Sequence, residues 1–237
     1  MNTKGKGQTR LGSLVTVESK LLALRATLRG LRTPGETLVK TACSSNEKVL
    51  SAAAGTGAVD GETTLTIDQV ASASRATAGA DLFSTTDTVA LGPGTFEFRV
   101  GEGEPQVIEL TSLTTLSQLV RAINTLGAGA TAVSVNIGTG ESRSYRLEIV
   151  ANETGSASNL TVINDDTKLD VSASAGTDAR FAIAGSLDTI EGASNLLLDV
   201  IPGVTVILKE SGSSAKVTVA NDSNAIEAKV QVFVDAF

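Results

Sequence analysis

Apolar residues near the N-terminus recur at the alternating three- and four-residue spacing of an α-helix. This spacing places them on one side of a predicted helix over residues 14–31, as in a coiled coil. The apolar stripe of this helix consists of Leu14, Val17, Leu21, Leu24, Leu28 and Leu31. Pro34 and Gly35 then end the helix, within an N-terminal helical segment of residues 1–35. A helix of this length is marginally stable alone, so we expect the stripe to contact another helix.

The last residues of the chain show the same type of spacing. They predict a C-terminal helix over residues 223–237, for which Asp222, Ser223 and Asn224 are candidate N-caps. Its apolar stripe consists of Ile226, Val230, Phe233 and Phe237. We expect the two terminal helices to pack antiparallel and to present their stripes as an assembly surface.

Between the helices, apolar and polar residues alternate with the period of two that is typical of half-buried strands. Alternation occurs in "KVLSAAAG" and "TTLTIDQV", and it returns late in the chain in "ARFAIAG", "VTVILK" and "KVTVA". The segment "ASASRATAGADLFSTTD" is small and polar, which predicts a linker. We therefore expect one discontinuous β domain, built from residues 36–77 and 179–222.

Residues 78–178 read as a separate inserted unit. A hairpin is predicted around "GTFEFRVGEGEPQVIEL", followed by an amphipathic helix in "TLSQLVRAINTLG". Thr115 and Gln118 have the spacing of a capping box, and Gly127 suits the C-terminal end of the helix. Three further strands are predicted in "ATAVSVNIG", "SYRLEIVA" and "NLTVIND". The predicted fold is α+β but mainly β: an antiparallel sheet domain with an inserted small α+β domain, flanked by N- and C-terminal helices.

Two apolar runs meet at Pro202-Gly203 in "NLLLDVIPGVTVILK". Proline cannot donate to a sheet ladder and glycine allows a positive φ, so we predict a structural corner at Ile201, Pro202 and Gly203. The segment Leu196–Val200 is expected to dock on a core. The strand Val204–Leu208 is expected to form a hairpin with residues 216–219.

The charge is unevenly distributed along the chain. The net charge is −7, but residues 1–40 carry eight Lys or Arg against Glu18 and Glu36, a balance of +6. The rest of the chain is acidic and would repel phosphate, so we expect the basic helix to pair with an acidic protein surface and expect no nucleic-acid partner. No run approaches the ~20 apolar residues of a membrane span, and residues 1–16 lack the apolar region of a cleaved secretory signal.

The composition also argues against catalysis. The chain has no His, which excludes Ser-His-Asp triads and imidazole metal sites, and its one cysteine, Cys43, has no candidate base nearby in sequence. Asp165, Asp166 and Asp170 lack the spacing of a calcium loop, and Arg143 and Arg146 mark the end of a hairpin. We therefore predict no enzyme activity, no cofactor and no metal.

Segments in a characteristic order resemble the bacterial flagellar filament cap family, hook-associated protein 2 (FliD). The strongest is "DVIPGVTVILKESGSSAKVTVANDSNAIEAKVQVFVDAF" at residues 199–237. "SSNEKVLSAAAGTGAVDGETTLTIDQVASA" is similar to the family's early strand region. "TLSQLVRAINTLGAGATAVSVN" and "YRLEIVANETGSASNLTV" are similar to its hook-IN-type module, within residues 78–178. The family usually continues into a second helical half, so the resemblance implies a core fragment or a shortened member.

The resemblance implies a structural cap at the flagellar filament tip that promotes flagellin folding and insertion. Its partners would be flagellin and itself, as a ring of four to six copies, with hook–filament junction proteins or a host surface as further candidates. It would be extracellular and exported through the flagellar secretion system without a cleaved signal peptide. The alternative is a surface adhesin or phage-tail-like binding module; it is disfavoured because the chain has one Tyr and no Trp for sugar stacking.

Overall fold

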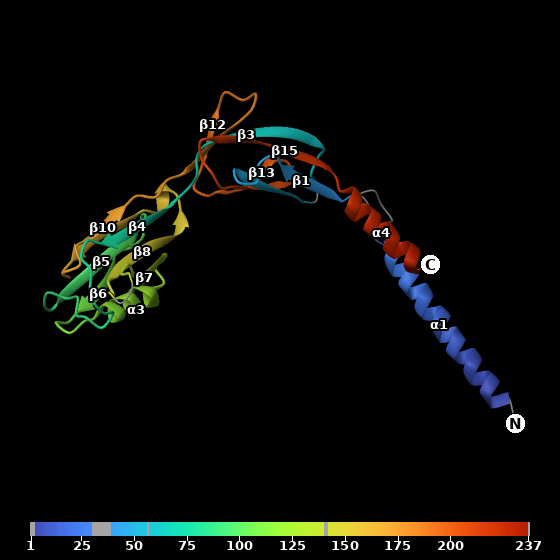
Figure 1. Ribbon diagram of the computed structural model, residues 1–237, viewed down its shortest axis with the longest axis horizontal. Coiled ribbons are helices and arrows are strands. Elements are labelled where there is room, and N and C mark those ends of the chain that lie inside the picture. Colours follow the sequence, from blue (N-terminus) through green and yellow to red (C-terminus); the bar gives the residue numbers. More distant parts are fainter. Residues whose placement is uncertain (1–2, 30–38, 56, 140–141, 237) are drawn as a thin grey trace.

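The computed structural model describes residues 3–29, 39–55, 57–139 and 142–236. The molecule is elongated and has three parts in a row (Figure 1). A pair of terminal helices lies at one end, a β domain lies in the middle, and an α+β domain lies at the far end. We call the last two the middle domain and the distal domain. The predicted fold class, mainly β with antiparallel sheets and terminal helices, is confirmed.

The middle domain is built from two antiparallel sheets. The first has the strand order β1-β15-β3-β11-β12, and the second has the order β13-β14-β2. The strands of the first sheet are β1 (Lys40–Ser44), β3 (Gly61–Gln69), β11 (Ala179–Ile183), β12 (Thr189–Gly192) and β15 (Ser213–Asn221). Those of the second are β2 (Leu50–Ala54), β13 (Leu196–Ile201) and β14 (Val204–Leu208). An aliphatic core that includes Leu65, Ile67 and Val206 holds the domain together.

The distal domain also contains two antiparallel sheets, with the orders β10-β4-β8-β7 and β6-β5-β9. The first comprises β4 (Ala73–Ala78), β7 (Ala130–Asn136), β8 (Tyr145–Thr154) and β10 (Val171–Ser174). The second comprises β5 (Gly94–Val100), β6 (Gln106–Leu110) and β9 (Leu160–Asp165), and a short turn of 3₁₀ helix covers Ser156–Ser158. Phe96, Phe98 and Leu147 are fully buried in its core.

Helix α3 (Leu116–Leu126) packs on β7 and is defined at both ends by its sequence. The Thr115 hydroxyl accepts from the Gln118 N–H, the Gln118 side chain accepts from the Thr115 N–H, and Gly127 ends the helix with a φ of 60°. The predicted capping box is therefore confirmed. Asn124 also exchanges two hydrogen bonds with the backbone of Ala132, at 2.7 and 2.9 Å, which tethers α3 to the edge strand β7.

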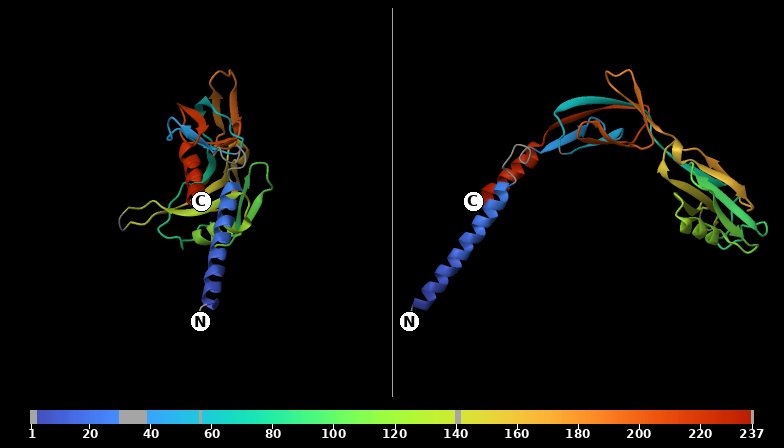
Figure 2. Two further views of the ribbon diagram at one scale, coloured as in Figure 1. Left: turned by 90° about the vertical axis from the view of Figure 1, so that its right-hand side faces the viewer. Right: turned by 180° about the vertical axis from the view of Figure 1, so that it is seen from behind.

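Helix α1 (Thr3–Arg29) and helix α4 (Ser223–Ala236) both lie on the same side of the middle domain, and their chain directions are opposite (Figures 1 and 2). They contact each other where the C-terminal end of α1 meets the C-terminal part of α4, and the rest of α1 extends beyond α4. Helix α1 starts well before the predicted residue 14. Residues 3–13 contain no proline that would interrupt a helix, but they lack the apolar spacing on which the prediction was based. Of the three candidate N-caps of α4, Asp222 has this role: its carboxylate accepts a hydrogen bond from the Ala225 N–H at 2.9 Å.

Two sequence predictions in the β region are wrong, and a third, the docking of residues 196–200 on a core, holds for Leu197 and Val200 but not for the whole segment. The expected linker contains β4, a strand inside the distal sheet, because small residues such as Ala76 and Ala78 fit its close-packed core. Strand β14 pairs with β13 and β2 rather than with residues 216–219, which belong to β15 and pair with β1 and β3. Residues 196–200 form part of strand β13, so Leu197 faces the core while Leu196 and Leu198 face outward.

Candidate assembly surfaces

The two helix stripes lie only partly in the contact between α1 and α4. On α1, Leu24 is half-buried, whereas Leu14, Val17, Leu21 and Leu28 are exposed by 46–66%. On α4, Ile226 and Phe233 are half-buried and Val230 is exposed. Leu31 and Phe237 lie outside the described residues. The helix pair therefore leaves most of its apolar stripe uncovered.

Further apolar side chains are exposed on other sides of the same helices. Val15 and Leu22 are exposed on α1, and Val232 and Val234 are exposed on α4. A helix with apolar side chains on several sides is typically buried among other helices. The helix pair thus has the character of an incomplete bundle, with room for additional helices on more than one side. None of the described helices is both long and apolar enough to cross a membrane.

The middle and distal domains are joined by two chain crossings that lie side by side (Figure 1). One crossing leads from β3 to β4 and the other from β10 to β11. Ser72 and Thr177, one from each crossing, exchange backbone hydrogen bonds of 2.9 and 3.2 Å, and their hydroxyls lie 2.9 Å apart. The two crossings therefore form a short antiparallel ribbon rather than two independent linkers.

Side chains brace this joint from both domains. Asp178 accepts from the Ser156 N–H at 2.8 Å and from the Ser156 hydroxyl at 2.6 Å, and the Thr154 hydroxyl donates to the Ala193 carbonyl at 2.6 Å. The hydrogen bonds from Ser156 lower the pKa of the Asp178 carboxyl, although partial desolvation opposes them. Sequence reasoning missed these residues, since their partners are distant along the chain and Ser, Thr and Asp are common in loops.

The predicted corner at Ile201, Pro202 and Gly203 connects β13 to β14. Ile201 is buried in the core of the middle domain, and Gly203 has a φ of 68°. The register between β13 and β14 shifts just before the turn, where Asp199 adopts a φ of 56° and its carboxylate accepts from the Gly203 N–H. The corner is thus part of the fold of the domain, and its backbone packs beside Gly57 and Ala58.

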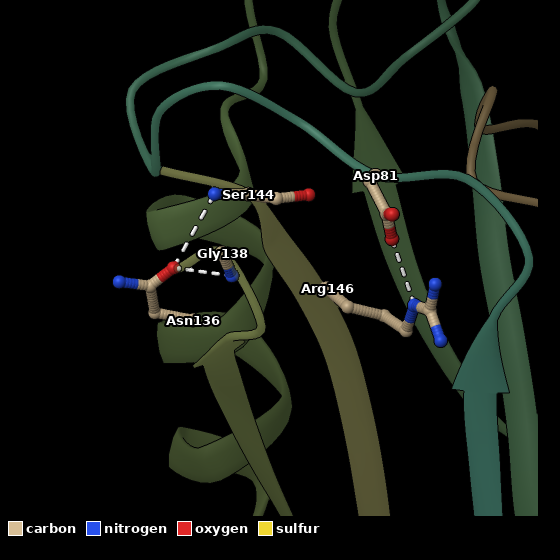
Figure 3. A network of polar contacts seen from close by, with 5 residues as sticks. All are labelled: Asp81, Asn136, Gly138, Ser144 and Arg146. Atoms are coloured by element: carbon tan, nitrogen blue, oxygen red, sulfur yellow. Dashed lines mark hydrogen bonds and ion pairs between the residues drawn. The ribbon is translucent and has the colours of Figure 1, made fainter. Parts of the chain in front are cut away.

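The hairpin between β7 and β8 projects away from the distal domain (Figure 2). The Asn136 side chain accepts from the N–H groups of Gly138 and Ser144, at 3.0 and 3.3 Å, at the base of its loop (Figure 3). Nearby, Arg146 donates from Nε to the Asp81 carboxylate at 2.7 Å, which lowers the pKa of Asp81 and raises that of Arg146. These contacts fix the base of the hairpin, so Arg146 has a structural role.

The acidic turn of the distal domain is likewise structural. Asp165 accepts from Thr167 and from the Val171 N–H, while Asp166 accepts from the Thr95 N–H and from Asn164. These backbone and side-chain hydrogen bonds lower the pKa of Asp166. Within the described residues, no group of three or more metal-ligating side chains comes together. Cys43 is exposed on the edge strand β1.

Comparison with known protein families identifies the family of this chain. The model of the flagellar hook-associated protein 2 N-terminus matches residues 2–74, and the model of its C-terminus matches residues 176–237. Together they cover more than half of the chain. The chain belongs to the flagellar hook-associated protein 2 family. The resemblance noted in the sequence is therefore confirmed.

Relatives in this family are distant in sequence. The chain is 28% identical to the B-type flagellar hook-associated protein 2 of Pseudomonas aeruginosa, over 97% of the chain and 53% of that protein. It is 26% identical to the flagellar hook-associated protein 2 of Escherichia coli, over 70% of the chain and 35% of that protein. The chain thus spans about half the length of the first of these curated relatives and about a third of the second.

Solved structures of the family share the fold. The D1-D2-D3 domains of the flagellar cap protein FliD from Escherichia coli superpose with a TM-score of 0.73 and 22% identity, over 95% of the chain and 67% of that structure. FliD from Pseudomonas aeruginosa gives a TM-score of 0.58 at 22% identity, over 79% of the chain and 91% of that structure. At this level of identity the likeness concerns the fold.

Proposed function

We propose that the chain acts as a structural cap at the tip of a bacterial flagellar filament, where copies assemble as a ring and promote the folding and insertion of flagellin. Its membership of the hook-associated protein 2 family supports this role. The single structural observation that carries it is the helix pair, whose exposed apolar side chains form a surface of the kind that further helices cover. Such helices would come from neighbouring copies or from flagellin.

In this proposal the chain works through contacts rather than catalysis. The elongated shape separates the helix pair from the distal domain (Figure 1). Each copy therefore offers the helix pair, the middle domain and the distal domain as separate contact surfaces for neighbouring copies or flagellin. Its location would be extracellular, at the flagellum tip, after export through the flagellar secretion system. A single cysteine means that folding after export needs no internal disulfide.

The proposal is tested by adding purified, gold-labelled chain to flagellar filaments and imaging them by negative-stain electron microscopy. We expect label at one filament end and flagellin elongation beneath it. The Leu14→Asp/Leu21→Asp double variant should lose end binding while the β domains still melt normally. The matched control, Ser19→Gln at an exposed uncharged position of the same helix, should retain end binding.

Absence of label from filament ends, with the chain folded and the control equally inactive, would refute the cap role. Binding to host-cell glycans without filament binding would favour the adhesin alternative. Label along filament sides would indicate an apolar surface with no preference for the tip.

A further inference from the structure

The outer faces of the two middle-domain sheets differ in their charge. On the five-stranded sheet, Lys216 pairs with Glu62 and Arg180 pairs with Glu191, each at 2.9 Å. On the three-stranded sheet, by contrast, three large aliphatic side chains point outward. They are Leu196, Leu198 and Ile207, which are 48%, 64% and 44% exposed. Antiparallel sheets that face water normally carry polar residues outward, so this face has the composition of a covered surface.

The register of the strands shows that these side chains form one patch, which we call the leucine face. Leu196 lies opposite Ile207, and Leu198 lies opposite Thr205, on the same side of the sheet. On β2, the cross-strand neighbours of Ile207 and Thr205 are Ser51 and Ala53. None of these outward side chains is charged. Strand β13 is also an edge strand, so the patch is open along one side.

The same domain carries an isolated apolar side chain at the tip of the hairpin between β11 and β12. Leu187 is fully exposed there, at 105%. The tip is an ordered turn, because the Ser186 N–H donates to the Ile183 carbonyl at 2.9 Å and the Asp188 N–H donates to the Ser186 hydroxyl at 3.2 Å. In Figure 1 this hairpin rises on one side of β3, whereas β13 lies on the other.

We propose that Leu187 of one copy packs against the leucine face of the next copy. The occupant is a second copy because this chain carries both halves of the contact, on opposite sides of one domain. A contact between two different patches is heterologous, and repeating it generates a ring when the rotation closes. The inference rests on the proposed ring assembly and assigns to it a specific contact.

The contact is apolar rather than electrostatic. The end of the leucine face where β14 ends and β2 begins is bordered by charges of both signs. These are Glu47, Lys48, Lys209 and Glu210. They give the face no single sign that could attract Asp188 at the hairpin tip. Added salt screens charge interactions but leaves apolar burial intact, so moderate salt should not weaken the association.

Disulfide trapping tests the contact directly. In the Cys43→Ser background, one preparation carries Leu187→Cys and a second carries Leu198→Cys. Under mild oxidation, the equimolar mixture should yield a disulfide-linked dimer on non-reducing gels, while each preparation alone stays monomeric. A chain that carries both substitutions should yield a ladder that ends at the ring size. As the matched control, Leu187→Cys mixed with Glu62→Cys on the five-stranded sheet should yield no dimer.

Each other outcome overturns the proposal. Dimers from the Leu187→Cys preparation alone would mean that like patches meet, as in an isologous contact. If light scattering shows rings but the mixed disulfide does not form, the ring is held by other contacts. This result would refute the contact of Leu187 with the leucine face but not the cap function. If no oligomer forms at any concentration, the contact fails, and the filament-end assay decides the cap function separately.

A second measurement avoids the cysteines. Leu187→Ser should raise the dissociation constant for self-association by about tenfold or more, because it removes the apolar side chain that the proposed contact buries. Leu91→Ser, the same substitution at a 75% exposed leucine of the distal domain, should leave the dissociation constant unchanged. Equal effects of both substitutions would contradict the assignment.

Discussion

Asn195 holds the backbone of Ala71 through both ends of its side-chain amide. The Ala71 N–H donates to Oδ1 at 2.7 Å, and Nδ2 donates to the Ala71 carbonyl at 2.8 Å. Ala71 is buried and lies in the crossing from β3 to β4, whereas Asn195 immediately precedes β13. One side chain therefore replaces a strand partner at the point where the chain leaves the middle domain.

Removal of this amide should destabilise the middle domain. Asn195→Ala leaves both backbone groups of Ala71 without their partner, so we expect a loss of about 1–3 kcal/mol in the free energy of unfolding. Urea denaturation followed by circular dichroism would measure it. Asn224→Ala, at an exposed position of α4, is the matched control and should change stability by less than about 0.5 kcal/mol. Equal stability of both variants would show that water replaces the amide.

Stability should decrease at acidic pH, in part through the interdomain joint. The folded pKa of Asp178 lies below its ordinary value, so ionised Asp178 stabilises the native state above the unfolded pKa. This contribution is lost as pH falls through the folded pKa, below about pH 4. Asp178→Asn keeps the side-chain shape but cannot titrate. Melting curves between about pH 6 and pH 3 should therefore fall less steeply for this variant. Curves parallel to the wild type would contradict the assignment.

Two glycines with the same backbone conformation allow a controlled test of the corner. Gly203 and Gly212 have φ values of 68° and 72°. A Cβ at Gly203 would lie 2.5 Å from the Ala58 nitrogen, whereas a Cβ at Gly212 would meet nothing within 4 Å. Both Ala substitutions incur the left-handed cost of about 1–2 kcal/mol. Gly203→Ala should lose a further ~1–3 kcal/mol through the clash, as measured by thermal unfolding. Equal losses would show that the corner relaxes freely.

The helix stripes should respond differently to truncation in the monomer and in the assembly. Leu24 is half-buried, so Leu24→Ala should cost about 1–2 kcal/mol in the dilute monomer, less than at a fully buried site. Leu21 is 59% exposed, so Leu21→Ala should cost less than about 0.5 kcal/mol there. Unfolding at low and high protein concentration would separate these effects. If the uncovered stripe serves assembly, Leu21→Ala becomes destabilising only at high concentration.

The sequence predicted features that depend on local spacing. The Thr115–Gln118 capping box lies within one helical turn, and the alternation around Leu65 and Ile67 reflects the pleat of a single strand. Strand pairing was harder to predict, because β13 precedes β14 and β15 follows it, and the apolar pattern of β14 does not show which of these two neighbours it pairs with. Strand β4 was missed because its small residues, three alanines with one serine and one threonine, resemble a linker until their neighbours are known. The exposure of Leu187 and the bracing by Asn195 depend entirely on tertiary structure.

The double crossing between the domains also determines the order in which the domains can fold when the chain emerges with its N-terminus first. Strand β3 pairs with β11 and β15, so its partners emerge only after the whole distal domain. The distal domain is complete once β10 has emerged, since all the strands of its two sheets lie between Ala73 and Ser174. A domain generally folds as a unit once its chain is complete. The part of the molecule farthest from the N-terminus in space should therefore fold first, while β1–β3 wait for their partners.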